Sequence, residues 1–325
     1  MKTNARFNNS EKIEGYVFST GTGFNQLSER VSGENSKNPG TKYIAGDLDI
    51  AVDEEGLNVI TVHFRYQAET TSSGKTNSTY AVLKKIIENA DTRTWLNGGK
   101  ENAFKVSCSN VSIAVNDFIG SDGKNVAALR NENGFCSFVD TLSPEHQRNT
   151  FTVDMLINKV SEIEADPEKG IEKPYAAVSG AVFGYGNPPV FIPITLVVKN
   201  EKGIKHFMDL EPSNGNPVFS KVWGRINCKT KREERVEESA FGEAAVQVFE
   251  RKTREYEITG AAMVPYDFGD PEVLTIDDVN TMIQNRQIML AEVQKRHDER
   301  KTAKTSGGDS AFNPVAQIPT GGFTF

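Results

Sequence analysis

The chain has 325 residues, a formal net charge of −7, a hydrophobic content of 37% and a charged content of 25%. These values describe a globular protein long enough for two domains, and no run of about 18 apolar residues marks a membrane span. The three cysteines and four histidines are scattered, so we expect no disulfide framework and no metal site. The first ten residues are polar, so we expect no signal peptide and a cytoplasmic protein.

The sequence pattern of the first half of the chain predicts strands with one helix among them. Alternating apolar residues predict strands at 13–18, 42–52, 57–66, 104–115 and 134–140. Apolar residues at helical spacing predict a helix over 80–89. The Gly-, Ser- and Asn-rich stretch 21–40 is too long for a tight hairpin, so we expect a mobile loop there.

The second half repeats this order after a polar junction at 143–150. Strands are expected at 151–164, 175–185, 190–199, 218–232 and 246–263. A short helix is expected at 204–210, so each half has a helix between its third and fourth strands. That layout is typical of the OB-fold, a five-stranded Greek-key barrel that binds oligonucleotides.

One short pattern recurs in five of the expected strands: an apolar residue, any residue, glycine, any residue, and an apolar or small residue. Its glycines are Gly15, Gly46, Gly180, Gly224 and Gly260. Glycine inside a strand marks a bend or a close approach of backbones, and small barrels need such bends. We therefore predict a mainly β protein with two OB-like Greek-key barrels in tandem, over residues 1–145 and 146–266.

The end of the chain has a different character. Thr275, followed by Asp277 and Asp278, predicts a helix start, and we expect a C-terminal helix within 267–304. Residues 305–325 are rich in small and polar residues and are expected to form a disordered tail. Phe323, Phe325 and the terminal carboxylate suit capture by a replication or recombination protein, and a tail without a role is the alternative.

The stretch 217–232, which contains the expected strand at 218–232, has two very different faces. Small and apolar side chains point to one side: Val222, Gly224, Ile226 and Cys228. The other side carries cations and an indole: Lys221, Trp223, Arg225, Lys229 and Lys231. Cations at every second residue can follow a phosphate backbone, and an exposed indole is a platform for a stacked base. A solvated outer strand face, with Trp223 partly covered by a loop, is the other interpretation.

Further candidate contacts lie on other strands. Tyr175, Phe183 and Tyr185 share a face opposite small residues, so we expect their rings outside the second barrel, where bases could stack. Packing beneath a loop or against the first barrel is the alternative. Acidic residues weaken the first barrel as a phosphate site, and Arg65 is the candidate contact that we take from it.

Several features resemble phage-encoded OB-fold single-stranded-DNA-binding proteins: the paired barrel-like halves, Val-Trp-Gly-Arg-Ile at 222–226, Glu-Glu-Ser-Ala-Phe-Gly-Glu at 237–243, and a Gly-rich tail ending in an aromatic residue. The resemblance covers residues 11–265 in layout. It implies largely sequence-independent binding of single-stranded DNA in DNA replication or recombination, without a cofactor. It also implies location in the host cytoplasm for a phage-encoded protein.

No nucleophile motif and no metal-ligand spacing occur in the sequence, so we expect no catalytic residues and no enzyme activity. An all-β structural or assembly protein of a phage virion is the alternative, since Gly-rich loops and an acidic pI also fit that class. The local charge favours nucleic-acid binding, because residues 219–235 carry six basic and two acidic side chains. The sequence leaves open the oligomeric state and the preference for DNA over RNA.

Overall fold

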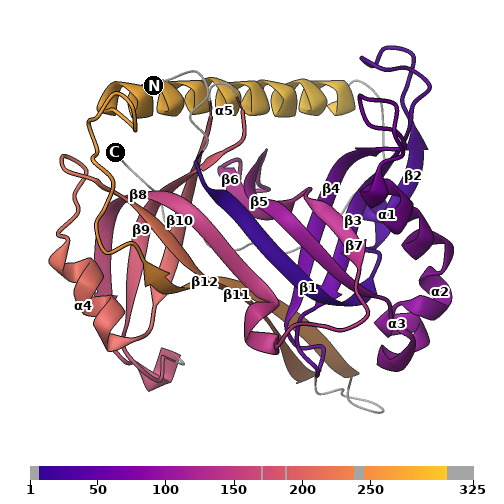
Figure 1. The fold of residues 1–325 in the computed structure, drawn as a ribbon, viewed down its shortest axis with the longest axis horizontal. Helices are drawn as coiled ribbons and strands as arrows, with labels where there is room; N and C mark the ends of the chain where they lie inside the picture. The colour runs from indigo at the N-terminus through magenta and orange to yellow at the C-terminus, as the bar shows by residue number, and fades with distance from the viewer. Residues whose placement is uncertain (1–6, 170, 187–188, 238–244, 306–325) are drawn as a thin grey trace.

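The computed structural model describes residues 7–169, 171–186, 189–237 and 245–305, with side chains described only outside 229–252 and up to residue 301. The structure is mainly β, and its strands form one twelve-stranded sheet (Figure 1). The strands are β1 (Asn9–Ser19), β2 (Ser28–Val31), β3 (Lys42–Ala51), β4 (Val59–Ala68), β5 (Lys105–Ile119), β6 (Asn125–Glu132), β7 (Phe135–Phe138), β8 (Asn149–Ile163), β9 (Tyr175–Gly184), β10 (Val190–Val198), β11 (Val218–Glu237) and β12 (Ala245–Ala261). The α-helices are α1 (Ser78–Glu88), α2 (Ala90–Arg93), α3 (Trp95–Gly98), α4 (Glu201–Asp209) and α5 (Ile276–Thr305).

Ten of these strands form two groups with the same order of pairings. In the first group, β1 pairs antiparallel with β3 and β5, β3 with β4, and β5 with β6, while β4 and β6 are parallel. In the second group, β8 pairs antiparallel with β9 and β11, β9 with β10, and β11 with β12, while β10 and β12 are parallel. Helices α1–α3 precede β5, and α4 precedes β11, so the helices occupy equivalent places in the two groups.

The two strand groups are joined rather than separate. β1 pairs with β8 from Asn9 opposite Val153 to Ile13 opposite Asn149, which makes the sheet continuous. One hydrophobic core contains buried residues of both groups, among them Val62 of β4 and Val178 of β9. The expected boundary at 145–146 lies between β7 and β8, and the β1–β8 ladder connects the two sides of it.

Some elements differ from the sequence expectations. The stretch 21–40 contains β2, which pairs with β3, although a mobile loop was expected. Its four side chains are exposed or half-buried, so β2 has no apolar alternation that could reveal a strand. β6 was also not expected, since only its last two residues are fully buried. The helical spacing of apolar residues over 80–89 predicted α1 correctly, and the helix begins two residues earlier, at Ser78.

The recurring glycines allow close contacts between neighbouring strands. A β-carbon on Gly180 would lie 2.0 Å from the carbonyl oxygen of Leu156, and one on Gly224 would lie 1.9 Å from that of Glu257. Both distances are shorter than any real contact of a β-carbon, so only glycine fits there. The register of β11 against β12 also shifts between Trp223 and Gly224. The prediction of bends or close approach at these glycines is confirmed.

Helix α5 lies across strands of both groups (Figure 1). A capping box begins it: the Asp278 amide donates to Oγ1 of Thr275 at 3.2 Å, and the Thr275 amide donates to Oδ2 of Asp278 at 3.0 Å. Arg286 forms a buried ion pair with Asp117 of β5 at 2.7 Å. The predicted C-terminal helix is confirmed. Among the described helices, α5 included, none is both long and apolar enough to cross a membrane.

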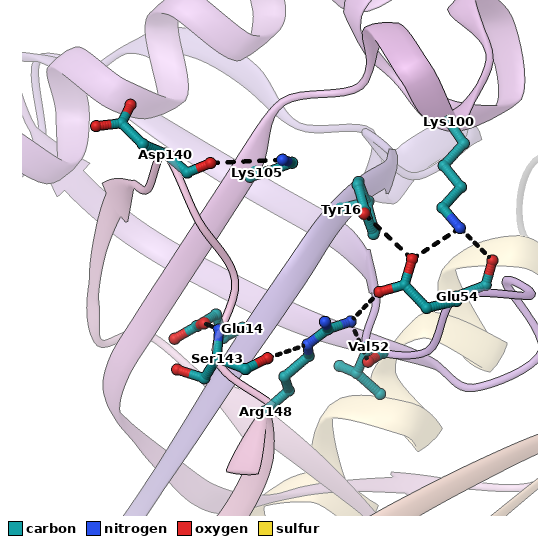
Figure 2. Close-up of polar contacts among 9 residues, drawn as sticks. All are labelled: Glu14, Tyr16, Val52, Glu54, Lys100, Lys105, Asp140, Ser143 and Arg148. Carbon is teal, nitrogen blue, oxygen red and sulfur yellow. Dashed lines mark hydrogen bonds and ion pairs between the residues drawn. The ribbon is translucent and has the colours of Figure 1, made fainter. Parts of the chain in front are cut away.

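A polar cluster fixes the chain between β7 and β8 to the first strand group (Figure 2). Glu54, in the turn after β3, accepts a hydrogen bond from Nη1 of Arg148 at 2.7 Å, and its other oxygen lies 2.7 Å from Nζ of Lys100. Nε of Arg148 donates to the carbonyl oxygen of Ser143 at 2.7 Å. The hydrogen bond from Lys100, and after it the one from Arg148, lower the pKa of Glu54 to about 2. The cluster therefore holds the start of β8 in place.

Candidate nucleic-acid interface

The outer face of β11 presents its polar side chains to solvent. Val222 and Ile226 have no exposed surface and Cys228 is 8% exposed, whereas Trp223 is 40% exposed. Arg225 is also exposed, and Lys221 is half-buried. The alternation expected for this strand is therefore present over residues 221–228. The side chains of Lys229 and Lys231 lie outside the described residues.

The indole of Trp223 covers a glycine on the neighbouring strand. Trp223 and Gly260 are partners in the β11–β12 ladder. A β-carbon on Gly260 would lie 2.5 Å from Nε1 of the indole and 2.6–2.7 Å from Cε2 and Cζ2. The ring therefore takes the space that any other residue at position 260 would fill. It is supported on the side of the sheet and is still accessible to solvent.

The cations beside this indole are available for an anion. Among the described side chains, none forms a hydrogen bond or ion pair with the Lys221 ammonium or the Arg225 guanidinium. Glu257 stands opposite Arg225 in the ladder. It accepts a hydrogen bond from Nδ2 of Asn227 at 3.0 Å and lies 3.7 Å from Nζ of Lys199. Because other groups already satisfy Glu257, Arg225 can bind a phosphate without losing an ion pair.

The segment after β12 carries exposed apolar side chains next to β11. The amide of Ala262 donates to the carbonyl oxygen of Lys221 at 2.9 Å, so the segment runs beside β11. Met263 is 93% exposed and Val264 is 79% exposed. We call Lys221, Trp223, Arg225 and Met263 the Trp223 platform. Sequence reasoning missed Met263, although an apolar pair just before Pro265 was a visible signal.

The aromatic residues of β9 do not join this platform as a group. Phe183 is 1% exposed, so the prediction of an accessible ring there is wrong. Its ring centroid lies 4.6 Å from that of Phe7 and 5.9 Å from that of Phe219. These rings belong to a second hydrophobic core, which α5 covers. Tyr185 is 55% exposed and donates a hydrogen bond to the carbonyl oxygen of Asn9 at 3.2 Å. Tyr175 is half-buried at the opposite end of β9, roughly 30 Å from Tyr185 along an extended strand.

Arg65 belongs to a different patch, on the first strand group. Its Nε lies 2.9 Å from Oε2 of Glu132, a side chain that is only 5% exposed. Tyr66 stacks on Tyr43 with 4.4 Å between ring centroids and is 43% exposed. Strict alternation from the buried residues Ile60, Val62 and Phe64 would place Tyr66 inside, whereas the side chain is exposed. The register of β3 against β4 shifts beside these residues, and such bulges redirect side chains.

A buried polar cluster connects the two strand groups. The hydroxyl of Tyr256 lies 3.2 Å from Oε1 of Glu11 and 3.0 Å from Oδ1 of Asn131. Burial raises the pKa of Glu11 from 4.5 to about 8. A hydroxyl has one proton for these two acceptors, so a protonated Glu11 supplies the second donor. The cluster is closed to solvent and stabilises the contact between the groups.

The described residues gather no group of three or more His, Cys, Asp or Glu side chains that could hold a metal ion. The acids of β3 instead bond to neighbouring side chains. Oδ1 of Asp47 lies 2.5 Å from Nδ1 of His63, and Asp49 accepts hydrogen bonds from Thr61 and Ser19 at 2.5 Å each. These contacts belong to the outer surface of the first strand group.

Fold and site together define a mainly β protein with two repeated strand groups and an exposed aromatic and cationic strand face. A family model described as YorF matches residues 23–296. The match covers most of the chain, and the protein therefore belongs to the YorF family. No curated protein matches the chain significantly. The matched region includes β11, β12 and the segment after β12, and thus all four residues of the Trp223 platform.

Proposed function

We propose that this protein binds single-stranded DNA through the Trp223 platform. The observation that carries the proposal is the exposed indole of Trp223, supported on Gly260 and placed between two cations that have no partner among the described side chains. A base stacked on an aromatic side chain contributes about 1–3 kcal/mol, whatever its identity. Stacking combined with phosphate contacts gives binding that is largely independent of sequence.

We further propose that each strand group is an OB-type barrel. If the five strands of each group are numbered in chain order, strand 1 pairs with 2, 2 with 3, 3 with 5, 5 with 4, and 4 with 1, and only strands 3 and 5 are parallel. A helix between strands 3 and 4 completes the OB layout. Single-strand-binding proteins commonly use this fold, which supports the proposed function.

The proposed role is the coating of exposed strands in DNA replication or recombination, in the cytoplasm and without a catalysed reaction. Phe323 and Phe325, the predicted contacts for a replication or recombination protein, lie outside the described residues. A virion assembly protein is the alternative from the sequence. No feature of the described residues specifically favours it.

The direct test is fluorescence anisotropy of a labelled oligo-dT of about 12 nucleotides, a length within the site sizes of OB folds. The titration is repeated between about 50 and 200 mM salt, with a duplex of the same length as control. We expect preferential binding of the single strand, with an affinity that falls by roughly 0.7 log units per log unit of salt for each phosphate contact. Absence of binding at the lowest salt would reject the proposal and leave the assembly function.

A further inference from the structure

A groove of about 270 Å³ lies between α4 and the end of β12. Gly260, which supports the indole of Trp223, is also part of the groove wall. Met263 of the Trp223 platform lines the groove as well. The groove is therefore contiguous with the platform.

The lining of the groove combines apolar and cationic groups. Phe207 and Ile258 are each 2% exposed and form an apolar floor. Lys202 and His206 line the groove from α4. They are four residues apart on one helix, so they lie on the same helical face. The groove thus offers an apolar surface for a ring and an ammonium for an anion.

We infer that this groove receives the nucleotide adjacent to the base that stacks on Trp223, an inference that rests on the proposed function. Lys202 binds the phosphate of that nucleotide, and Met263 contacts its base. A volume of about 270 Å³ lies just below the range of roughly 300–1,000 Å³ found for drug-sized ligands, so it suits one nucleotide better than a peptide helix. Consecutive nucleotides are covalently linked, so a strand stacked on the indole brings its next nucleotide to Gly260.

The chain offers a matched control for each contact. Lys205 is an exposed lysine of α4 that does not line the groove, so Lys205→Gln is the control for Lys202→Gln. Val264 is an exposed neighbour of Met263 that also does not line the groove, so Val264→Ala is the control for Met263→Ala. All four side chains are exposed, and thermal melts verify that each variant folds.

The experiment measures the affinity of each variant for oligo-dT across salt concentrations. Lys202→Gln should lower the magnitude of the log-log salt slope by roughly 0.7, while Lys205→Gln leaves it unchanged. Met263→Ala should weaken binding about fivefold with the same salt slope, and Val264→Ala by less than about twofold. Trp223 emission should still respond to oligo-dT in all four variants, because the stacked base is a separate contact.

Two results would overturn the inference. Equal effects of Lys202→Gln and Lys205→Gln would mean that only the general field of α4 acts on DNA. Equal effects of Met263→Ala and Val264→Ala would mean that no base enters the groove. In either case wild-type binding and its sensitivity to Trp223→Ala would leave the proposed function standing. Absence of wild-type binding would reject both.

Discussion

Trp223 and Gly260 face each other across the β11–β12 ladder, and a β-carbon at position 260 would come within 2.5 Å of the indole nitrogen. The glycine thus sets the position of an aromatic ring that is 40% exposed. This arrangement holds the ring against the sheet and keeps the side chain accessible.

Gly260→Ala should displace the indole and weaken binding of oligo-dT without any loss of charge. We expect the affinity to fall about fivefold to tenfold, which corresponds to the lower part of the free energy that one stacked base contributes. The matched control is Gly215→Ala, since a β-carbon on Gly215 meets no atom within 4 Å. Unchanged affinity in Gly260→Ala would show that the ring position does not matter for binding.

Lys221→Gln and Arg225→Gln should each reduce the magnitude of the log-log salt slope by roughly 0.7, because each removes one phosphate contact. The slope of the double variant should fall by about twice that amount. Anisotropy titrations of oligo-dT across salt give the slopes, with Lys205→Gln as control. A double variant that keeps the wild-type slope and affinity would exclude these cations from the site.

Arg65→Gln tests whether Arg65 serves binding or stability. The buried carboxylate of Glu132 would lose the guanidinium that lies 2.9 Å away. We expect the free energy of unfolding to fall by about 1–3 kcal/mol, since a buried charged group is left unsatisfied. Urea unfolding measures this change, and oligo-dT affinity per folded molecule should stay within about twofold. A large loss of affinity without destabilisation would instead place Arg65 in the interface.

Glu11 should make the stability depend on pH between about 4.5 and about 8. Burial raises its pKa in the folded protein to about 8 from an ordinary value of 4.5, so the folded state binds more protons between these values. The stability is therefore lost as the pH rises from about 4.5 through about 8. Urea unfolding of the wild type and of Glu11→Gln at several pH values tests this. Glu11→Gln, which cannot ionise, should lose less stability than the wild type as the pH rises through this range. Parallel stability curves for the two proteins would contradict the assignment.

The sequence predicted most strands, because apolar side chains that face the core alternate along them with side chains on the outer face. Five glycines in a repeated pattern also predicted the close contacts of strands, which are seen at Gly180 and Gly224. The fate of Phe183 could not be predicted in this way. Its ring is covered by α5, which begins more than 90 residues later, and alternation carries no information on such distant packing.

The same limit applies to the candidate site. Alternation identified the exposed side chains of β11, but Tyr66 became exposed only through a shift of register, which the sequence does not show. Met263 and the α4 groove lie next to Trp223 because the chain after β12 continues beside β11 and α4 packs near it. Long-range pairing of this kind depends on the tertiary structure rather than on local pattern.

The emission of Trp223 during binding is the most direct measurement of the central claim. Trp95→Phe removes the other tryptophan of the chain, so that the remaining emission comes from Trp223 alone. In this variant, oligo-dT should quench the emission in a saturable way, with the same midpoint as the anisotropy of the labelled strand. Trp223→Phe, in which only Trp95 emits, should bind oligo-dT with little change in emission. Saturable binding with unchanged Trp223 emission would show that DNA does not stack on this indole, and the site would lie elsewhere.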